Sequence, residues 1–362
     1  MPSPASVTFP EAGPRFGNAR RPRGGDLGAM LALAFLLAVT AADSVLVIAH
    51  RGASGDLPEH TLEAYRLAVE HGADVIEPDV VATRDGVLIA RHENEISETT
   101  DVAARVEFAG RRTTKTIDGR EVTGWFTEDF TLAEIKTLRA VERLPDLRPE
   151  SAAYDGRFEI PTLAEVIDLA RRLGAERGRP VGLYPETKHP TYFRQIGLPL
   201  DEPLVALLHE AGYTSPADPV WIQSFEAGNL RRLRGLTDLR LVFLAYPGGA
   251  PFDAPAETYD ALLAPDRLGE VAAFADALGV HKRFVLTEAG ADTGFAEAAR
   301  AAGLDVHVWT VRAENAFLLP PFRLGDDPAA HGDLAAEVRA LAEAGVDGVF
   351  TDHTRLAVEA LR

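Results

Sequence analysis

The chain has 362 residues, of which 46% are hydrophobic and 25% charged, the balance of a soluble globular protein with one large domain or two ordinary ones. It contains no cysteine, which excludes disulfides and thiolate metal sites. The formal net charge of −18 disfavours binding to nucleic acid or to an anionic membrane. Any phosphate chemistry must therefore depend on local cationic side chains or on a bound metal.

The start of the chain has the pattern of an export signal. Several arginines lie within residues 15–26, and an apolar run follows over residues 27–42, closed by small residues. This order predicts a secretory signal peptide at 1–42, and therefore a periplasmic or secreted protein with no stable membrane association after cleavage. The run is short for a bilayer-spanning helix, which makes an uncleaved anchor the weaker alternative. Met30 is an alternative start that would remove the basic part.

From Val45 onward, short β-rich runs alternate with amphipathic helical stretches. The strand candidates are 45–50, 75–81, 87–92, 181–186, 220–224, 240–245, 284–288, 305–311 and 346–351. The clearest helix candidates are 61–71, 162–173 and 333–344, and each begins at a residue suited to cap a helix N-terminus, namely Thr61, Thr162 and Asp333.

This alternation predicts parallel strands and an α/β fold, with a TIM (β/α)8 barrel over residues 43–362 as the first choice. An open doubly wound sheet is the second choice, and the absence of a glycine-rich loop after the first strand lowers it. The number of strand candidates is one greater than the number of strands in such a barrel. Either 284–288 or a hairpin partner within 75–92 is therefore accessory. The polar residues 93–160, after the third strand, are expected to form an insertion at the barrel mouth.

The first two strand ends carry a histidine, an arginine and two carboxylates. His50 and Arg51 close the first strand, where a barrel places its catalytic groups, although a structural hydrogen bond is the alternative role for the histidine. Glu77 and Asp79 stand at positions i and i+2 of the second strand and face the same way. Like charges this close predict a divalent metal with oxygen ligands, and solvated acids at an exposed strand end are the alternative.

The next strand ends add His92 and the pair Glu186 and Lys188. Two histidines at the barrel mouth, His50 and His92, suit a general base and a general acid on opposite sides of a phosphate. Glu186 is expected to join the carboxylates and Lys188 to bind phosphate. Trp309 is expected either to form an apolar wall of the pocket or to pack in the core.

These residues lie in segments that resemble the glycerophosphodiester phosphodiesterase family. The longest is IAHRGASGDLPEHTLEAYRLAVEHGADVIEPDVVATRDGVLIARHE at 48–93, and later ones are PETK (185–188), IQSF (222–225), VHVWTVR (306–312) and GVDGVFTD (345–352). The resemblance covers about residues 45–358. The segment PEHT, with His60 where many relatives have asparagine, is most similar to the periplasmic bacterial branch.

The resemblance implies a TIM barrel with an insertion and a divalent metal, Ca²⁺ first and Mg²⁺ as the alternative. It implies metal ligands at Glu77, Asp79 and Glu186, catalytic histidines at His50 and His92, phosphate-binding residues at Arg51 and Lys188, and Trp309 in the family's aromatic segment. Pro78 departs from the family pattern and predicts an irregular strand.

The expected reaction is metal-dependent hydrolysis of glycerophosphodiesters, such as glycerophosphocholine and glycerophosphoethanolamine, to sn-glycerol 3-phosphate and an alcohol. The partner is therefore a small molecule, and the sequence does not indicate an oligomeric state. A lysophospholipase D or phospholipase C of the same superfamily is one alternative, but it needs an apolar groove, and residues 93–160 offer little apolar surface. A catalytically silent binding protein on the same scaffold is the other, and the complete set of site residues disfavours it.

Overall fold

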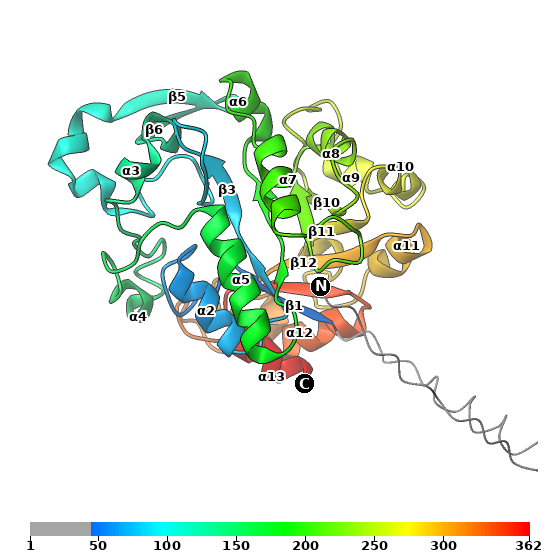
Figure 1. Cartoon of the computed structure of the whole chain (residues 1–362). Helices are drawn as coiled ribbons and strands as arrows, with labels where there is room; N and C mark the ends of the chain where they lie inside the picture. The colour runs from blue at the N-terminus through cyan, green and yellow to red at the C-terminus, as the bar shows by residue number, and fades with distance from the viewer. Residues whose placement is uncertain (1–44) are drawn as a thin grey trace, which may run out of the picture. The chain divides into compact units, whose positions relative to one another are not determined.

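The computed structural model describes residues 45–362, where a curled sheet is surrounded by helices (Figure 1). The barrel strands are β1 (Leu46–His50), β2 (Val75–Glu77) with β3 (Asp79–Ala82), β7 (Gly182–Leu183) with β8 (Glu186–Thr187), β9 (Trp221–Ser224), β10 (Arg240–Ala245), β11 (Ala277–His281), β12 (Asp305–Val311) and β13 (Gly348–Thr351).

The parallel pairings close this sheet into a ring. β1 pairs with β13 on one side and with β2 on the other. β2 pairs with β7 while β3 pairs with β8, so each of these couples is one barrel strand with an interruption. The interruptions fall at Pro78 and at Tyr184 to Pro185, where proline has no N–H to donate to the ladder. From β8 the ring continues through β9, β10, β11 and β12 to β13. The predicted TIM barrel is confirmed.

Two strand candidates behave differently from the barrel strands. The third candidate contains β4 (Leu88–Ala90), which pairs antiparallel with β3 and is the accessory hairpin partner. The strand predicted at 284–288 is wrong: a 3-10 turn, Lys282–Phe284, leads into a loop there, and the barrel strand is β11. The sequence analysis missed β11 because this strand contains small residues, and glycine has low β-propensity. A Cβ on Gly279 would meet the Leu244 side chain at 2.4 Å, so close packing requires this glycine.

The helices lie outside the ring and bury their apolar faces against it (Figure 1). They are α2 (Leu62–Glu70), α5 (Leu163–Arg177), α6 (Pro190–Gln195), α7 (Asp201–Glu210), α8 (Ala227–Arg234), α9 (Tyr259–Leu262), α10 (Leu268–Ala272), α11 (Phe295–Ala301), α12 (Leu334–Glu343) and α13 (Thr354–Leu361). Thr61, Thr162 and Asp333 cap α2, α5 and α12 as predicted, each accepting a backbone hydrogen bond with its side chain.

Alternate residues of the strands divide the core in two. Val47 and Ala49 of β1 face the helices, whereas Ile48 faces the barrel interior. The interior is filled by large side chains, including Tyr184, Trp221 and Phe350. It is therefore a packed core, and the strand ends above it are left to build a site.

Residues 93–160 lie between β4 and α5 as a separate lobe (Figure 1). This insertion contains 3-10 turns at Asp101–Ala104, Val106–Arg111 and Thr127–Asp129, a hairpin of β5 (Thr113–Ile117) and β6 (Arg120–Gly124), and the short helices α3 (Leu132–Ile135) and α4 (Pro149–Ala152). Among the helices of residues 45–362, none combines the length and apolar character that crossing a bilayer requires. The predicted signal segment 1–42 lies outside the described residues.

Candidate active site

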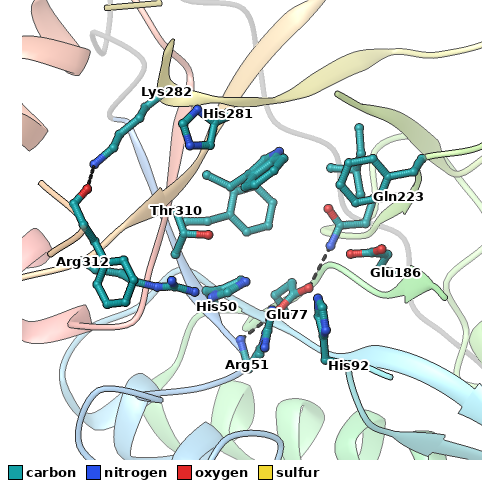
Figure 2. Close-up of a pocket in the computed structure, with 15 residues that line it drawn as sticks. His50, Arg51, Glu77, His92, Glu186, Gln223, His281, Lys282, Thr310 and Arg312 are labelled. Carbon is teal, nitrogen blue, oxygen red and sulfur yellow. Dashed lines mark hydrogen bonds between the residues drawn. The ribbon is translucent and has the colours of Figure 1, made fainter. Parts of the chain in front are cut away.

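A pocket opens at the carboxyl ends of the barrel strands and encloses about 190 Å³ (Figure 2). The site residues predicted from the sequence that line it are His50, Arg51, Glu77, His92, Glu186 and Trp309. Asp79 and Lys188 stand directly behind this wall, because Asp79 lies 3.4 Å from Arg51 and Lys188 donates to Glu186. The structure thus brings all eight predicted residues to one end of the barrel.

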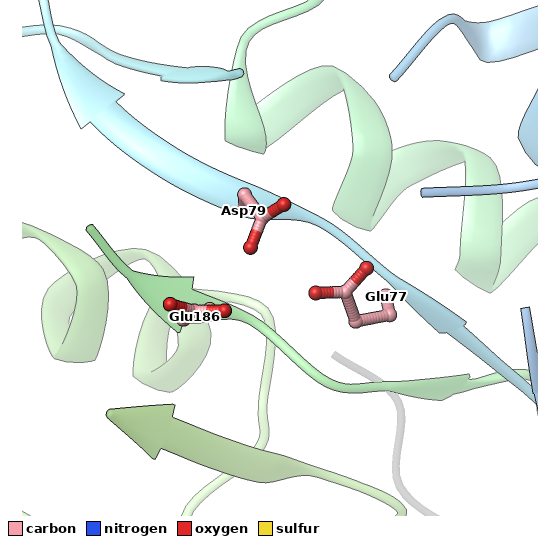
Figure 3. Close-up of side chains that lie close together, drawn as sticks. All are labelled: Glu77, Asp79 and Glu186. Atoms are coloured by element: carbon pink, nitrogen blue, oxygen red, sulfur yellow. The ribbon is translucent and has the colours of Figure 1, made fainter. Parts of the chain in front are cut away.

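Three buried carboxylates form the centre of this site (Figure 3). One oxygen from each of Glu77, Asp79 and Glu186 lies within 4.8 Å of the others. Strand pairing explains the cluster: Asp79 is the register partner of Glu186, and Glu77 ends the first half of the same interrupted strand. Gln223 donates to Glu77 Oε1 at 2.9 Å, and the Arg51 backbone N–H donates to Glu77 Oε2 at 2.8 Å.

The electrostatics of the three carboxylates call for a cation. Burial, with Asp79 and Glu186 close by, raises the pKa of Glu77 well above its usual range. Burial also raises the pKa of Glu186 to about 8, although Lys188 pulls it down. For Asp79 burial acts in the same direction, but Lys188, His92 and His60 together outweigh it and hold the pKa well below its usual range. The local cations therefore stabilise only part of the negative charge.

The donor set fits a hard divalent ion. Every candidate ligand is an oxygen, and oxygen ligands are what Ca²⁺ and Mg²⁺ prefer. Asp79 Oδ1 is buried without a hydrogen-bond partner in the described residues, although an orphaned buried carboxylate oxygen is costly. A metal bound between the carboxylates would satisfy this atom and remove their mutual repulsion.

His50 is held by an aspartate that the sequence argument did not single out. Its Nδ1 lies 2.6 Å from Asp352 Oδ1, and the other oxygen of Asp352 accepts from Arg148 and Arg312 at 2.6 and 2.7 Å. These arginines keep Asp352 ionised, with its pKa well below the usual range despite burial. The imidazole therefore carries its proton on Nδ1 and leaves the Nε2 lone pair available. Burial and the adjacent Arg51 lower the pKa of His50 to about 4.

His92 follows β4 by two residues and has different neighbours. Its Nδ1 hydrogen-bonds Glu93, and its Nε2 lies 3.2 Å from Lys188 Nζ. Burial is the main cause that lowers the pKa of His92 to about 3, and the charges of Arg51 and Lys188 add to it. The two histidines are therefore neutral near pH 7 before a substrate is bound, and an anion among these cations would raise the pKa of His92.

Arg51 turns the chain sharply at the pocket wall. Its φ of 61° is unusual for a residue other than glycine. This turn directs its backbone N–H at Glu77, while its guanidinium donates to Glu59 at 3.0 Å and lies 3.4 Å from Asp79. The atom nearest Asp79 is the buried Nε, which makes no hydrogen bond with the described residues. The local backbone thus places a cation beside the carboxylates.

Several residues that support the site were missed by the sequence argument. They are Asp352, Gln223, Arg148 and His60, the last of which hydrogen-bonds Asp79 Oδ2 at 2.9 Å. Two of these residues could have been predicted from their positions at the carboxyl ends of barrel strands. Gln223 lies in β9, and Asp352 directly follows β13. Arg148 comes from the insertion, and its spacing in the sequence gives no hint of this contact.

Comparisons with known proteins identify the family of this chain. The model of the Glycerophosphoryl diester phosphodiesterase family matches residues 50–356. A glycerophosphodiester phosphodiesterase of Arabidopsis thaliana is 35% identical over 85% of this chain and 83% of its own length. One of Haemophilus influenzae is 31% identical over 88% of this chain and 90% of its own length. A phosphodiesterase of Oleispira antarctica, solved with the product sn-glycerol-3-phosphate, shares the fold with a TM-score of 0.57 at 22% identity, over 88% of this chain and 96% of that one.

Fold and site define a TIM-barrel enzyme whose pocket combines buried carboxylates, two histidines and several cations. The family model covers most of the chain, and both relatives align with it over most of their own length. The chain therefore belongs to the glycerophosphoryl diester phosphodiesterase family, and it is an enzyme of that class. The family resemblance seen in the sequence is confirmed, and the placement in its periplasmic branch stays a prediction.

Proposed function

We propose that the protein hydrolyses glycerophosphodiesters, such as glycerophosphocholine and glycerophosphoethanolamine, to sn-glycerol 3-phosphate and an alcohol with the help of a divalent metal. The observation that carries the proposal is the meeting of the carboxylate cluster, two histidines and Arg51 in one pocket of a chain of this family. The fold neighbour from Oleispira antarctica, which was solved with sn-glycerol-3-phosphate, supports the product.

Substrate binding follows from the charges of the pocket. Arg51 and Lys188 attract the phosphate, and Trp309 covers the apolar side of the glycerol. Glu77, Asp79 and Glu186 would hold the metal, which as a Lewis acid would offset charge on the phosphoryl oxygens. Ca²⁺ is the ion that we propose, because a site of carboxylates suits it and an exported enzyme meets more of it.

Proton transfer is assigned to the two histidines. His50, neutral and oriented by Asp352, accepts the proton of the nucleophile at Nε2 as a new oxygen–phosphorus bond forms. The nucleophile is either water or the 2-hydroxyl of the substrate's own glycerol, the second through a cyclic phosphate that water then opens. His92 is assigned the role of acid in its protonated form, which an anionic phosphate favours by raising its pKa; it gives a proton to the alcohol oxygen as the bond of that oxygen to phosphorus breaks.

Removal of the metal tests this proposal directly. In excess chelator we expect activity on glycerophosphocholine to be lost and the melting temperature to fall, because the three carboxylates then repel one another. Calcium should restore activity at least as well as magnesium. Turnover rate and melting curves, measured with and without chelator, check both effects. Full activity in excess chelator would show that no metal is needed.

We also propose that the protein is exported, on the evidence of the arginines and apolar run of residues 15–42. The mature N-terminus is then expected at Ala42 or Asp43. Intact-mass measurement of protein recovered from the periplasm or medium of an expressing bacterium checks this expectation. A full-length species confined to the cytoplasm contradicts it.

A further inference from the structure

A second cavity adjoins the active-site pocket and takes no part in the chemistry proposed above. It encloses about 480 Å³, against about 190 Å³ for the first, and the two share Glu186 and Phe225 as lining residues. Its other walls come from the turn of the β5–β6 hairpin, the start of α6 and the loop after β10. A molecule bound at the carboxylates can therefore extend one of its ends into this space.

The insertion closes the cavity on one side. The hairpin reaches from the inserted lobe toward α6 (Figure 1), where Asp118 Oδ2 lies 2.5 Å from Nδ1 of His189, the residue that precedes the helix. At the turn itself, a Cβ on Gly119 would lie 3.8 Å from the Phe252 ring in the loop after β10. The shape of the cavity is thus set by a segment that the barrel does not require.

Aromatic rings form one wall of this second cavity. The Phe225 ring centroid lies 5.9 Å from that of Tyr246, which lies 5.2 Å from that of Tyr259. Phe252 adds a fourth ring from the loop after β10. The Tyr259 hydroxyl donates to the Phe225 carbonyl at 3.0 Å, which holds these rings in place. Ring faces attract alkylated ammonium groups more strongly than neutral groups of the same shape.

The lining of the second cavity also contains several carboxylates. Apart from the shared Glu186, these carboxylates are Glu93, Glu95, Asp118 and Glu226. The cations that line the same cavity are Arg120 and Lys188, and His189 also lines it. Arg143 neutralises the charge of Glu93, and Glu186 neutralises the charge of Lys188. Glu226 is buried and forms no ion pair with any described residue, and its carboxylate accepts only from Thr191. The lining therefore carries an excess of negative charge.

The two cavities differ in charge, and this difference orients a substrate. Once Glu77, Asp79 and Glu186 hold the proposed divalent metal, the first pocket suits the anionic phosphate and repels a cationic alcohol, because Arg51 and the metal then set its charge. The second cavity offers carboxylates and rings instead. Resting on the phosphodiesterase activity proposed above, we propose that this second cavity binds the leaving alcohol and selects alcohols that carry an ammonium group. Burial, together with the nearby Asp253 and Asp118, raises the pKa of Glu226 to about 7, which agrees with a carboxylate that lacks a positive partner.

A pair of substrates of equal shape tests the selection. Glycerophosphocholine is compared with the diester in which a carbon atom replaces the quaternary nitrogen, so that only the charge differs. We expect kcat/KM to be about tenfold higher for the choline diester, the size of a partly desolvated cation–π contact with charge attraction added. Equal values for the two diesters would overturn the cation selection alone. No turnover of either diester would overturn the proposed phosphodiesterase activity and this inference with it.

Asp118→Asn is the matched variant. Asp118 and Gly119 form a two-residue turn with φ of 47° and 76°, and asparagine suits this turn as well as aspartate does. The variant therefore removes a charge and keeps the hairpin. We expect the preference for the choline diester to fall about three- to tenfold. Glu121→Gln removes an equal charge from an exposed position outside the cavity on the same hairpin, and should leave the preference unchanged. An unchanged preference in Asp118→Asn, with a wild-type melting curve, would contradict the role of this wall.

Discussion

His50 and His92 line the same pocket, but their surroundings suit them to different steps. The hydrogen bond with Asp352 orients His50 without depending on substrate, so a neutral base is ready in the free enzyme. His92 faces Lys188 and becomes a useful acid only when an anion offsets that charge. It also precedes Glu93, which lines the cavity proposed for the leaving alcohol. This position places the acid on the side where the alcohol departs.

At the residue scale we predict that His50→Ala and His92→Ala each lower kcat about 10²- to 10⁴-fold while the metal stays bound. Glu77→Ala, Asp79→Ala and Glu186→Ala should lose activity and metal together, because each removes one candidate ligand. Steady-state kinetics and calcium titration by calorimetry separate the two groups of variants. Less than a tenfold loss in both histidine variants would exclude the two-histidine mechanism.

A nitrophenyl diester tells the two histidines apart, because its leaving group needs little protonation. Activity of His92→Ala should recover substantially on this substrate, whereas His50→Ala should stay inactive. Recovery of His50→Ala instead would mean that the two roles are reversed.

At the scale of elements, Arg148 joins the insertion to the barrel. It precedes α4 and donates to Glu314 and Asp352 at 2.6 Å each and to the Ser54 carbonyl at 2.9 Å. All these contacts are buried, and they link the inserted lobe to the loops that follow β1, β12 and β13. The insertion therefore takes part in orienting His50 through Asp352.

We predict that Arg148→Met lowers the free energy of unfolding by about 3–5 kcal/mol, because it leaves the buried Glu314 carboxylate without its hydrogen-bond donor and removes one of the two arginines that bind Asp352. It should also lower kcat, since Asp352 then holds His50 less firmly. Urea denaturation and steady-state kinetics measure the two effects. Arg267→Met is the control: its carboxylate partners are exposed, so the loss of stability there should be much smaller. Similar losses in both variants would contradict the role given to Arg148.

At the scale of the whole molecule, the barrel interior contains a titratable group that does not line the active-site pocket. His307 packs against Tyr184 and Trp221 in the inner core, and its Nδ1 lies 2.6 Å from the Tyr184 hydroxyl. Burial lowers its pKa from 6.5 to about 4. Between these two pH values the unfolded chain binds a proton that the folded protein does not, so acid favours unfolding. Above pH 6.5 the group has no effect.

We therefore predict that the titration of His307 lowers the free energy of unfolding by up to about 3 kcal/mol as the pH falls from 7 to 4. His307→Asn keeps a side-chain partner for the Tyr184 hydroxyl but does not titrate. Its free energy of unfolding should depend on pH less steeply than that of the wild type over this range. Urea unfolding at several pH values measures both slopes, and equal slopes would show that His307 does not titrate on unfolding.

Patterns in the sequence were enough to predict the barrel and the residues at its mouth. Alternating periods and capping threonines are local signals, and the carboxyl ends of parallel strands meet at one end of a barrel, so Glu77 and Glu186 were expected together despite their distance in the chain. The same reasoning misplaced the strand at 284–288, because β11 is specified by close packing around Gly279 and not by β-propensity.

The residues that support those at the barrel mouth could be found only in the folded protein. The partners of His50 and Asp79, namely Asp352 and His60, depend on side-chain directions that no local pattern encodes. The path of the insertion, which brings Arg148 to Asp352 and Asp118 to His189, depends on long-range packing. Strand alternation and capping act between near neighbours in the chain and can be read in order, whereas charge pairing across hundreds of residues exists only once the chain has folded.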